Sequence, residues 1–157
     1  MKIIGVIGGS LVSEKIYETA RRVGNLIAER GYPVLSGGLG GVMEAVSKGA
    51  KEKNGLVIGI LPGNSKSEAN PYIDIPIVTG MGEMRNVIIV KSSDVLIAID
   101  GAYGTMTEIA FALKFGKRVI GLECDLPFEK VEKTNSPEEA VEKAIKFLEN
   151  DDFHRGR

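Results

Sequence analysis

The sequence predicts an α/β fold, a three-layer sandwich in which helices cover both faces of a mostly parallel sheet. Short apolar runs alternate with longer amphipathic ones along the chain, which is typical of successive βαβ units. The first run, Lys2–Gly8, is apolar almost throughout, as expected for a strand that is covered on both faces. A length of 157 residues suits one core, so we expect a single domain over residues 1–150.

The elements of the amino-terminal half follow in order. Ser13–Arg30 has apolar residues at helical spacing and ends at a glycine, which predicts an amphipathic helix. A short strand over Val34–Ser36, a helix over Gly41–Lys53 and a strand over Leu56–Leu61 come next. The polar stretch Asn64–Tyr72 holds a proline and few apolar residues, so we expect a mobile loop there.

The carboxyl-terminal half continues the same pattern. We expect strands over Ile75–Val78, Val95–Ile99 and Val119–Leu122, and helices over Glu83–Ser92 and Thr107–Phe115. A final helix begins at Ser136, because Pro137 suits a first helical turn and Ser136 with Glu139 has the pattern of a capping box. Beyond it we expect residues 151–157 to be a disordered tail.

The charge balance excludes two classes of partner. The chain has 20 lysines and arginines against 21 aspartates and glutamates, so it lacks the positive footprint of a protein that binds duplex nucleic acid. No basic amphipathic stretch indicates a membrane surface. The apolar start of the chain is too short for a signal peptide or a membrane span. We therefore expect neither nucleic acid nor a membrane as partner.

Cysteine and histidine occur once each. The single cysteine, Cys124, leaves no internal disulfide and indicates a reducing compartment, so we expect a cytoplasmic protein. Because Cys124 ends a strand-like run with no histidine nearby, we expect a buried thiol rather than a nucleophile. The one histidine is His154. Because zinc sites usually take several cysteine and histidine ligands and the chain has one of each, we expect no metal site.

Glycine-rich turns follow three of the expected strands. Ligands of a parallel α/β sheet bind beyond the carboxyl ends of its strands, so these turns mark a candidate site. They are Gly8-Gly9-Ser10, Ser36-Gly37-Gly38-Leu39-Gly40-Gly41 and Asp100-Gly101-Ala102-Tyr103-Gly104-Thr105. One such turn is often a plain connector between a strand and a helix, but three at one sheet edge favour a ligand site.

Turns of this kind suit a phosphate group. Glycine has no Cβ, so a ligand can approach the backbone closely. The first amides of the following helix lack partners within it and carry about half a positive charge from the aligned peptide dipoles. A phosphate binds there without a lysine. We therefore expect a small phosphate-bearing, nucleotide-like ligand, provided that these amides are not buried against protein.

Two common phosphate-binding motifs do not fit the chain. A dinucleotide fingerprint needs G-x-G-x-x-G after the first strand and an acidic residue after the second, and neither is present. A P-loop needs a lysine directly after its closing glycine, whereas Lys66 lies three places after Gly63. The site is therefore of another kind.

The glycine loops resemble those of the LOG family, often labelled lysine decarboxylase-like, and of the related molybdenum-cofactor carrier proteins. The LOG pattern has G-G-G-x-x-G-L-M after the second strand, M-x-x-R-K at the start of a helix, and P-G-G-x-G-T-x-x-E after a later strand. The matching segments here are Ser36–Met43, Met81–Asn86 and Gly101–Glu108, and Val57–Pro62 matches a strand that ends in proline. The resemblance covers about residues 2–125 and implies a Rossmann-like fold.

The resemblance also implies a reaction and its residues. LOG enzymes cleave the base from a nucleoside 5′-monophosphate and release ribose 5-phosphate. By position Arg85 and Glu108 would be the catalytic pair, with the Glu108 carboxylate stabilising positive charge on the ribose and Arg85 holding the phosphate or the base. No cofactor is required, and nothing resembles a lysine Schiff-base site. The expected ligand-binding residues are Gly8, Gly9, Ser10, Ser36, Gly37, Gly38, Gly40, Gly41, Pro62, Gly101, Tyr103, Gly104 and Thr105.

Departures from the LOG pattern keep a second function open. Ala102 replaces the second glycine of the later loop, its proline is absent, and Asn86 replaces the lysine after the arginine. In these features the chain is similar to the carrier branch, which implies a non-catalytic carrier or sensor with the molybdenum cofactor as its cargo. Under either function the resemblance implies a homodimer or larger homo-oligomer, for which Met84–Ser92 and Thr107–Phe115 offer apolar surfaces.

Structural roles are open for several of the same residues. Thr105 and Glu108 have the pattern of a capping box, so Glu108 either closes its helix or faces a ligand. Arg85 either lies in solvent beside Glu83 or binds the ligand. Tyr103 either stacks on a base or is simply exposed. Packing or subunit contacts are expected for Met81, Met84 and Met106.

Overall fold

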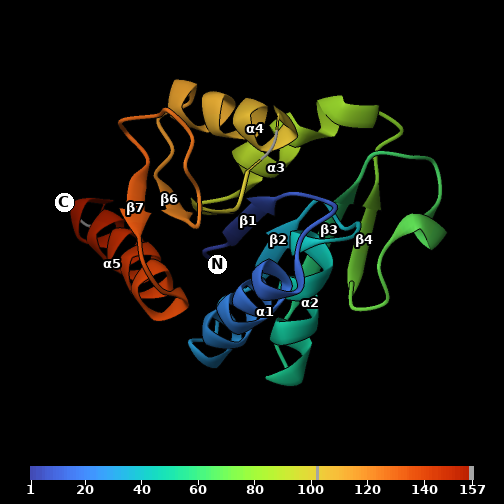
Figure 1. The fold of residues 1–157 in the computed structure, drawn as a ribbon, viewed down its shortest axis with the longest axis horizontal. Coiled ribbons are helices and arrows are strands. Elements are labelled where there is room, and N and C mark those ends of the chain that lie inside the picture. The colour runs from blue at the N-terminus through green and yellow to red at the C-terminus, as the bar shows by residue number, and fades with distance from the viewer. Residues whose placement is uncertain (102, 156–157) are drawn as a thin grey trace.

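The computed structural model describes residues 1–101 and 103–155, and it has the expected three layers. The strands are β1 (Ile4–Gly8), β2 (Val34–Ser36), β3 (Val57–Leu61), β4 (Ile75–Val78), β5 (Val95–Ile99), β6 (Val119–Leu122) and β7 (Glu132–Thr134). The α-helices are α1 (Glu14–Glu29), α2 (Val42–Glu52), α3 (Asn86–Ser92), α4 (Tyr103–Lys114) and α5 (Pro137–Arg155). The 3-10 helices are η1 (Lys66–Glu68) and η2 (Gly82–Arg85). Figure 1 shows α1, α2 and α5 on one face of the sheet and α3 and α4 on the other.

The sheet is parallel throughout, and its strand order places a crevice beside β1. In the described part of the chain the order is β4-β3-β2-β1-β5-β6-β7. The chain thus builds outward from β1 to β4 and then returns to the other side of β1 with β5. Gly8 of β1 pairs with Ile99 of β5, so the loops after these two strands lie next to each other. Ligands of open α/β sheets bind at such a switch point.

The layer of α1, α2 and α5 is built on small residues where its helices meet. Ser13 caps α1 by accepting a hydrogen bond from the Ile16 amide at 3.2 Å. A Cβ on Gly24 would overlap the Val46 carbonyl, and one on Gly49 would overlap the Arg21 carbonyl. These contacts show that α1 and α2 pack backbone to backbone, which fixes the start of α2 next to the loop after β1.

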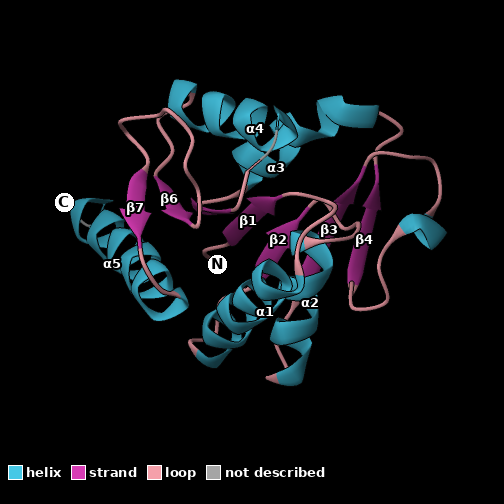
Figure 2. Ribbon diagram, viewed as in Figure 1, coloured by secondary structure: helices cyan, strands magenta, loops and turns pink. Residues whose placement is uncertain are grey.

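The opposite layer has a core of its own. Ile89 and Val90 of α3 and Ile109 and Ala112 of α4 are fully buried against the sheet, together with Ile7 of β1. Figure 2 shows this layer as the two helices above the strands. Its packing places the first turn of α4 beside the carboxyl ends of β1 and β5.

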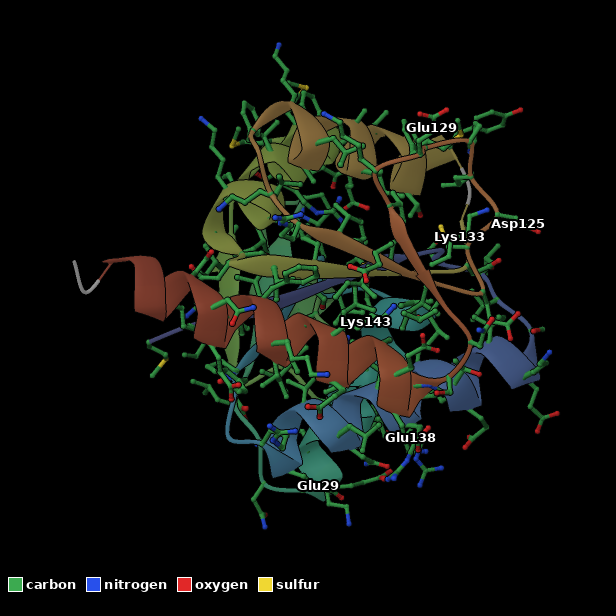
Figure 3. The ribbon with its side chains drawn as sticks, turned by 90° about the vertical axis from the view of Figure 1, so that its left-hand side faces the viewer. Glu29, Asp125, Glu129, Lys133, Glu138 and Lys143 are labelled. Carbon is green, nitrogen blue, oxygen red and sulfur yellow. The ribbon has the colours of Figure 1, made fainter. Side chains whose placement is uncertain are left out.

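Ion pairs on the surface join α5 to its neighbours, and Figure 3 labels two of the α5 residues that take part, Glu138 and Lys143. Glu138 lies 3.1 Å from Arg22 of α1, and Lys143 lies 3.1 Å from Glu132 of β7. Such exposed pairs contribute little to the free energy of folding. They orient α5, while its buried apolar residues supply most of the attachment.

The expected α/β class is confirmed, and the differences lie at element boundaries. The strand β7 was not predicted, α4 begins at Tyr103 rather than Thr107, and the segment expected as one helix from Glu83 divides into η2 and α3. The helix α5 continues to Arg155, past the start of the tail expected at residue 151, and residues 156–157 lie outside the described residues. No helix among the described residues has the length and apolar character needed to cross a membrane.

Loop 64–72 is tied to the second glycine loop. The Asn70 amide donates a hydrogen bond to the Gly38 carbonyl, and the Asn70 side chain donates one to the Leu39 carbonyl, both at 2.9 Å. The segment also contains η1, with Ser65 as its cap. Local sequence patterns do not predict these contacts, because they join positions about thirty residues apart.

Candidate functional site

A cavity of about 180 Å³ lies at the switch point, at the carboxyl edge of the sheet. It opens between the loop after β1, the second glycine loop, η2 and the first turns of α4. The residues that line it are Gly8, Gly9, Ser10, Leu39, Met43, Glu83, Arg85, Asn86, Gly104, Thr105 and Glu108. Segments from four parts of the chain thus meet here, at the sheet edge where the glycine turns lie.

The loop after β1 is locked against α2. The Gly9 carbonyl accepts a hydrogen bond from the Val42 amide at 3.0 Å. Gly41 has a φ of +60°, and a Cβ there would overlap the Gly9 carbonyl. A Cβ on Gly8 would likewise overlap the Ile99 carbonyl. Glycine is therefore needed at these positions for close packing of backbone segments.

This packing changes the expected roles of the helix amides. The first amide of α2, that of Val42, is taken by Gly9 and is not open to a ligand. At α4, by contrast, Gly104 and Thr105 line the cavity, and the first amides of a helix lack partners within it. The start of α4 is therefore the better place for a phosphate, while the second glycine loop mainly shapes the site.

Arg85 lies inside the protein, and its guanidinium is held in place by main-chain and side-chain oxygens. Its Nε donates to the Ile60 carbonyl at 3.0 Å, and its Nη1 donates to Oδ1 of Asn86. Only 5% of Arg85 is exposed, so the alternative of a solvated arginine is wrong. Burial lowers the pKa of the guanidinium, an effect opposed by Glu108 and Glu83.

The absence of a side chain at Gly37 makes room for this arginine. A Cβ there would lie 2.8 Å from Nη2 of Arg85 and 2.7 Å from Sδ of Met43. Real Cβ atoms do not approach other atoms so closely, so any larger residue at this position would displace the guanidinium. Gly37 does not line the cavity, but it determines where Arg85 lies.

Glu108 is the second buried ionisable group of the cavity. It is 8% exposed, and burial raises the pKa of its carboxyl to about 8, although the nearby Arg85 lowers it. Within residues 1–101 and 103–155 its carboxyl takes part in no hydrogen bond. The capping-box interpretation is wrong, because α4 begins at Tyr103 and Glu108 lies past its first turn, facing the cavity.

The structure divides the expected site residues into two groups. Those at the cavity are Gly8, Gly9, Ser10, Arg85, Gly104, Thr105 and Glu108. Those that do not line it are Ser36, Gly37, Gly38, Gly40, Gly41, Pro62, Gly101 and Tyr103. Several of the second group have local roles: Ser36 Oγ accepts a hydrogen bond from the Gly38 amide, and the Pro62 carbonyl accepts one from the Gly82 amide. Tyr103 is 87% exposed.

Four lining residues were not predicted: Leu39, Met43, Glu83 and Asn86. Each lies within a motif that the sequence analysis quoted, one or two positions from a residue that was selected. Leu39 and Met43 are apolar and Glu83 lies at an exposed turn, so composition alone gave no signal for them. Asn86 had one, since it stands where the LOG pattern has lysine.

Cys124 lies outside this cavity and is buried, as expected. Burial raises the pKa of its thiol, which keeps it in the less reactive protonated form.

Sequence comparison identifies the family. A profile of the SLOG cluster4 family matches residues 1–150. The protein belongs to this family. An uncharacterized protein of Archaeoglobus fulgidus is 54% identical to this SLOG cluster4 chain over 142 residues, which cover 90% of this chain and 93% of the relative.

Two solved structures that are similar to this SLOG cluster4 protein are of proteins that bind or carry the molybdenum cofactor. The molybdenum cofactor binding protein from Rippkaea orientalis is 40% identical, with a TM-score of 0.89, and the match covers 94% of this chain and 97% of that one. The molybdenum cofactor carrier protein from Chlamydomonas reinhardtii is 37% identical, with a TM-score of 0.87 and coverage of 94% and 98%. The expected resemblance to molybdenum-cofactor carriers is confirmed.

Proposed function

We propose that this protein binds and carries the molybdenum cofactor, a phosphorylated pterin, without cleaving it. The observation that carries the proposal is the pair of buried ionisable side chains in the switch-point cavity, Arg85 and Glu108. The Glu108 carboxyl has no hydrogen-bond partner among the described residues, and it faces a space that a ligand can enter. No described side-chain oxygen is both fully enclosed and unpaired, so the carboxyl oxygens are open to a molecule that enters the cavity. The similarity to two cofactor-binding proteins supports the choice of ligand.

The residues at the cavity fit both ends of such a ligand. The start of α4 at Gly104 and Thr105 offers amides to the phosphate. Leu39 and Met43 offer apolar surface to a flat ring, while Glu108 can reach its polar edge. The volume of about 180 Å³ is below the roughly 300–1,000 Å³ of sites that enclose a whole ligand. Part of the cofactor would therefore remain outside, where an accepting protein could take it.

A phosphoribohydrolase is the second candidate, since Arg85 and Glu108 both lie at the cavity as that reaction requires. The chemistry needs an ionised carboxylate to stabilise positive charge on the ribose. With a pKa of about 8, Glu108 is mostly protonated at neutral pH and offers little negative charge. This difference favours binding over hydrolysis.

One experiment separates the two functions. The purified protein is incubated anaerobically with molybdenum cofactor released from a molybdoenzyme, passed through a desalting column and assayed for bound molybdenum and pterin. A parallel sample receives a panel of nucleoside 5′-monophosphates, and free base is measured by chromatography. A carrier retains the cofactor and releases no base. Base release that disappears in Glu108→Gln would instead establish the hydrolase.

A matched pair of variants tests the location of the site. Lysine at position 85 keeps the charge but cannot reproduce the two directed bonds to Ile60 and Asn86, so Arg85→Lys should lose most of the cofactor binding. Arg118→Lys is the control, because Arg118 lies over the ring of Phe147, away from the cavity. Equal retention of cofactor by both variants would place the site elsewhere.

We also propose that the protein self-associates through the layer of α3 and α4. Met84 beside α3 is 61% exposed and Phe115 at the end of α4 is 38% exposed, which leaves apolar surface on that side of the molecule. Sedimentation velocity of the wild type and of Met84→Glu tests this: a mass above that of one chain should fall in the variant.

A further inference from the structure

We infer that Glu108 binds the ligand as a hydrogen-bond donor, in its protonated form, so that the ligand presents an acceptor to it. The acceptor would be a ring carbonyl oxygen, a ring nitrogen or a phosphate oxygen. This inference rests on the proposed binding function and names the chemistry of one contact in it. Glu108 thereby favours a ligand edge that presents an acceptor to its O–H, while its carbonyl oxygen can still accept a hydrogen bond.

The Glu108 carboxyl lies at the cavity without a partner from the described residues. The residue is more than nine-tenths buried, yet in the described part of the chain it has no hydrogen-bond partner. A buried carboxylate needs several donors to remain charged, and a protonated carboxyl needs one acceptor. Among the described residues no side-chain oxygen is fully enclosed without a partner, so the Glu108 oxygens are open to the cavity, where a bound ligand would replace solvent as their partner.

Two charged residues of η2 face the Glu108 carboxyl. They are Arg85 and Glu83, which lie on the other side of the cavity. Asp100 after β5 interacts instead with Cys124, and Lys91 of α3 lies over the Phe115 ring at the far end of α4. The lining residues from β1, its loop and α2 carry no charge.

The Arg85 guanidinium is bonded to oxygens other than those of Glu108. Its Nε and Nη1 donate to the Ile60 carbonyl and to Oδ1 of Asn86, so those two donors are not directed at Glu108. Arg85, the one cation among the described lining residues, is therefore bonded to oxygens of other residues. Glu83 adds negative charge to the same cavity. Burial favours the neutral carboxyl and raises its pKa to about 8, although Arg85 lowers that pKa and Glu83 raises it by less. A bound phosphate would add negative charge and favour the proton further.

The test is the pH dependence of affinity for a stable phosphorylated pterin, pterin-6-ylmethyl phosphate, followed by its fluorescence. Glu108→Gln keeps the shape and the donor but cannot lose a proton, so it should bind at pH 7 within about threefold of the wild type. Above pH 8 the wild type should lose affinity relative to the variant, by up to about tenfold per pH unit. Titration of the probe itself affects both proteins equally, so the ratio of their affinities isolates Glu108.

Glu108→Met adds a variant that removes the donor and keeps the size. It should bind at least tenfold more weakly than Glu108→Gln at pH 7. An infrared difference spectrum gives an independent readout, because binding to the wild type should shift a protonated-carboxyl band that Glu108→Gln lacks.

Two other results would overturn the inference. Affinity that rises with pH in the wild type, together with a large loss in Glu108→Gln, would show that a carboxylate accepts from the ligand; cofactor carriage would then stand and the donor role would fall. Failure of all three proteins to bind either the pterin probe or the cofactor itself would refute the proposed function as well.

Discussion

At the scale of single residues, the site depends on where a side chain is absent as much as on where one is present. Gly37 leaves the space that the Arg85 guanidinium fills, although it does not line the cavity. In the sequence Gly37 is one of several glycines in a loop, and all of them predicted ligand contact. The structure shows that its role is to position another residue.

Substitution of this glycine tests that role. Gly37→Ala should displace Arg85 and Met43, since the new Cβ would lie within 2.8 Å of both side chains. We expect a loss of stability of about 1–3 kcal/mol from overpacking and at least a tenfold loss of pterin affinity. Gly121→Ala is the control, because a Cβ there also crowds a side chain, that of Val131 at 2.9 Å, but Gly121 lies in β6 outside the cavity. Normal affinity in Gly37→Ala would contradict this account of Arg85.

The buried carboxyl also makes the stability of the ligand-free protein depend on pH. The folded-state pKa of Glu108 is raised by burial from 4.5 to about 8. Below pH 4.5 both folded and unfolded chains hold the proton, but between pH 4.5 and 8 only the unfolded chain releases it. Stability therefore falls as pH rises through this window.

Glu108→Gln removes this penalty. At pH 8 the variant should be more stable than the wild type by up to about 5 kcal/mol, and at pH 4 the two should be equal with respect to this group. Urea denaturation of both proteins across the window measures the difference. A wild type that is more stable than the variant at pH 8 would show that Glu108 is ionised and paired.

At the scale of elements, glycine in a helix has opposite consequences in α2 and α4. Gly49 in α2 faces the α1 backbone, where a Cβ would overlap the Arg21 carbonyl, and its own carbonyl accepts a hydrogen bond from Asn25 at 2.7 Å. Gly104 in α4 has open space where a Cβ would lie. The same substitution should therefore have opposite signs at the two positions.

Gly49→Ala should destabilise the fold by about 2–4 kcal/mol, because the two helices must move apart. Gly104→Ala should stabilise it by about 0.5–1 kcal/mol, the usual difference between alanine and glycine within a helix. Thermal and urea denaturation of the two variants measure both effects. A neutral Gly49→Ala would show that the helices do not cross as closely as described.

Element boundaries show where local sequence patterns were misleading. The helix was expected to start at Thr107, but α4 begins at Tyr103, so Thr105, despite its capping-box pattern with Glu108, does not cap it and Glu108 is turned toward the cavity. The same pattern at Ser136 and Glu139 was interpreted correctly: the Glu139 amide donates to Ser136 Oγ at 3.1 Å. The short strand β7 was missed because Glu132–Thr134 has no apolar run and forms only by pairing with β6.

At the scale of the whole molecule, the sheet combines a fully buried centre with an exposed edge. All five residues of β5 are buried, whereas Ile75, Ile77 and Val78 of the edge strand β4 are exposed. Local opening requires less free energy where fewer groups are buried. In hydrogen exchange we therefore expect β5 and β1 to exchange slowest and β4 much faster. Protection of β4 equal to that of β5 would contradict this, and would indicate that another chain covers the edge.

The sequence by itself determined the class of fold, the order of the main elements and the edge of the sheet at which a ligand can bind. It could do so because apolar periodicity and glycine turns are local properties, and parallel strands bring their carboxyl ends together. The resemblance to cofactor carriers likewise came from short motifs.

Only the tertiary structure decided which of those glycines contact the cavity. It also decided how deeply the ionisable residues are buried and which groups they bond to. The Val42 amide is taken by Gly9, and Arg85 is held by Ile60, a residue twenty-five positions away. Burial raises the pKa of Glu108 to about 8, and Arg85, which lowers it, is bonded to Ile60 and Asn86. Burial and pairing depend on residues that are distant along the chain, and no local pattern encodes them.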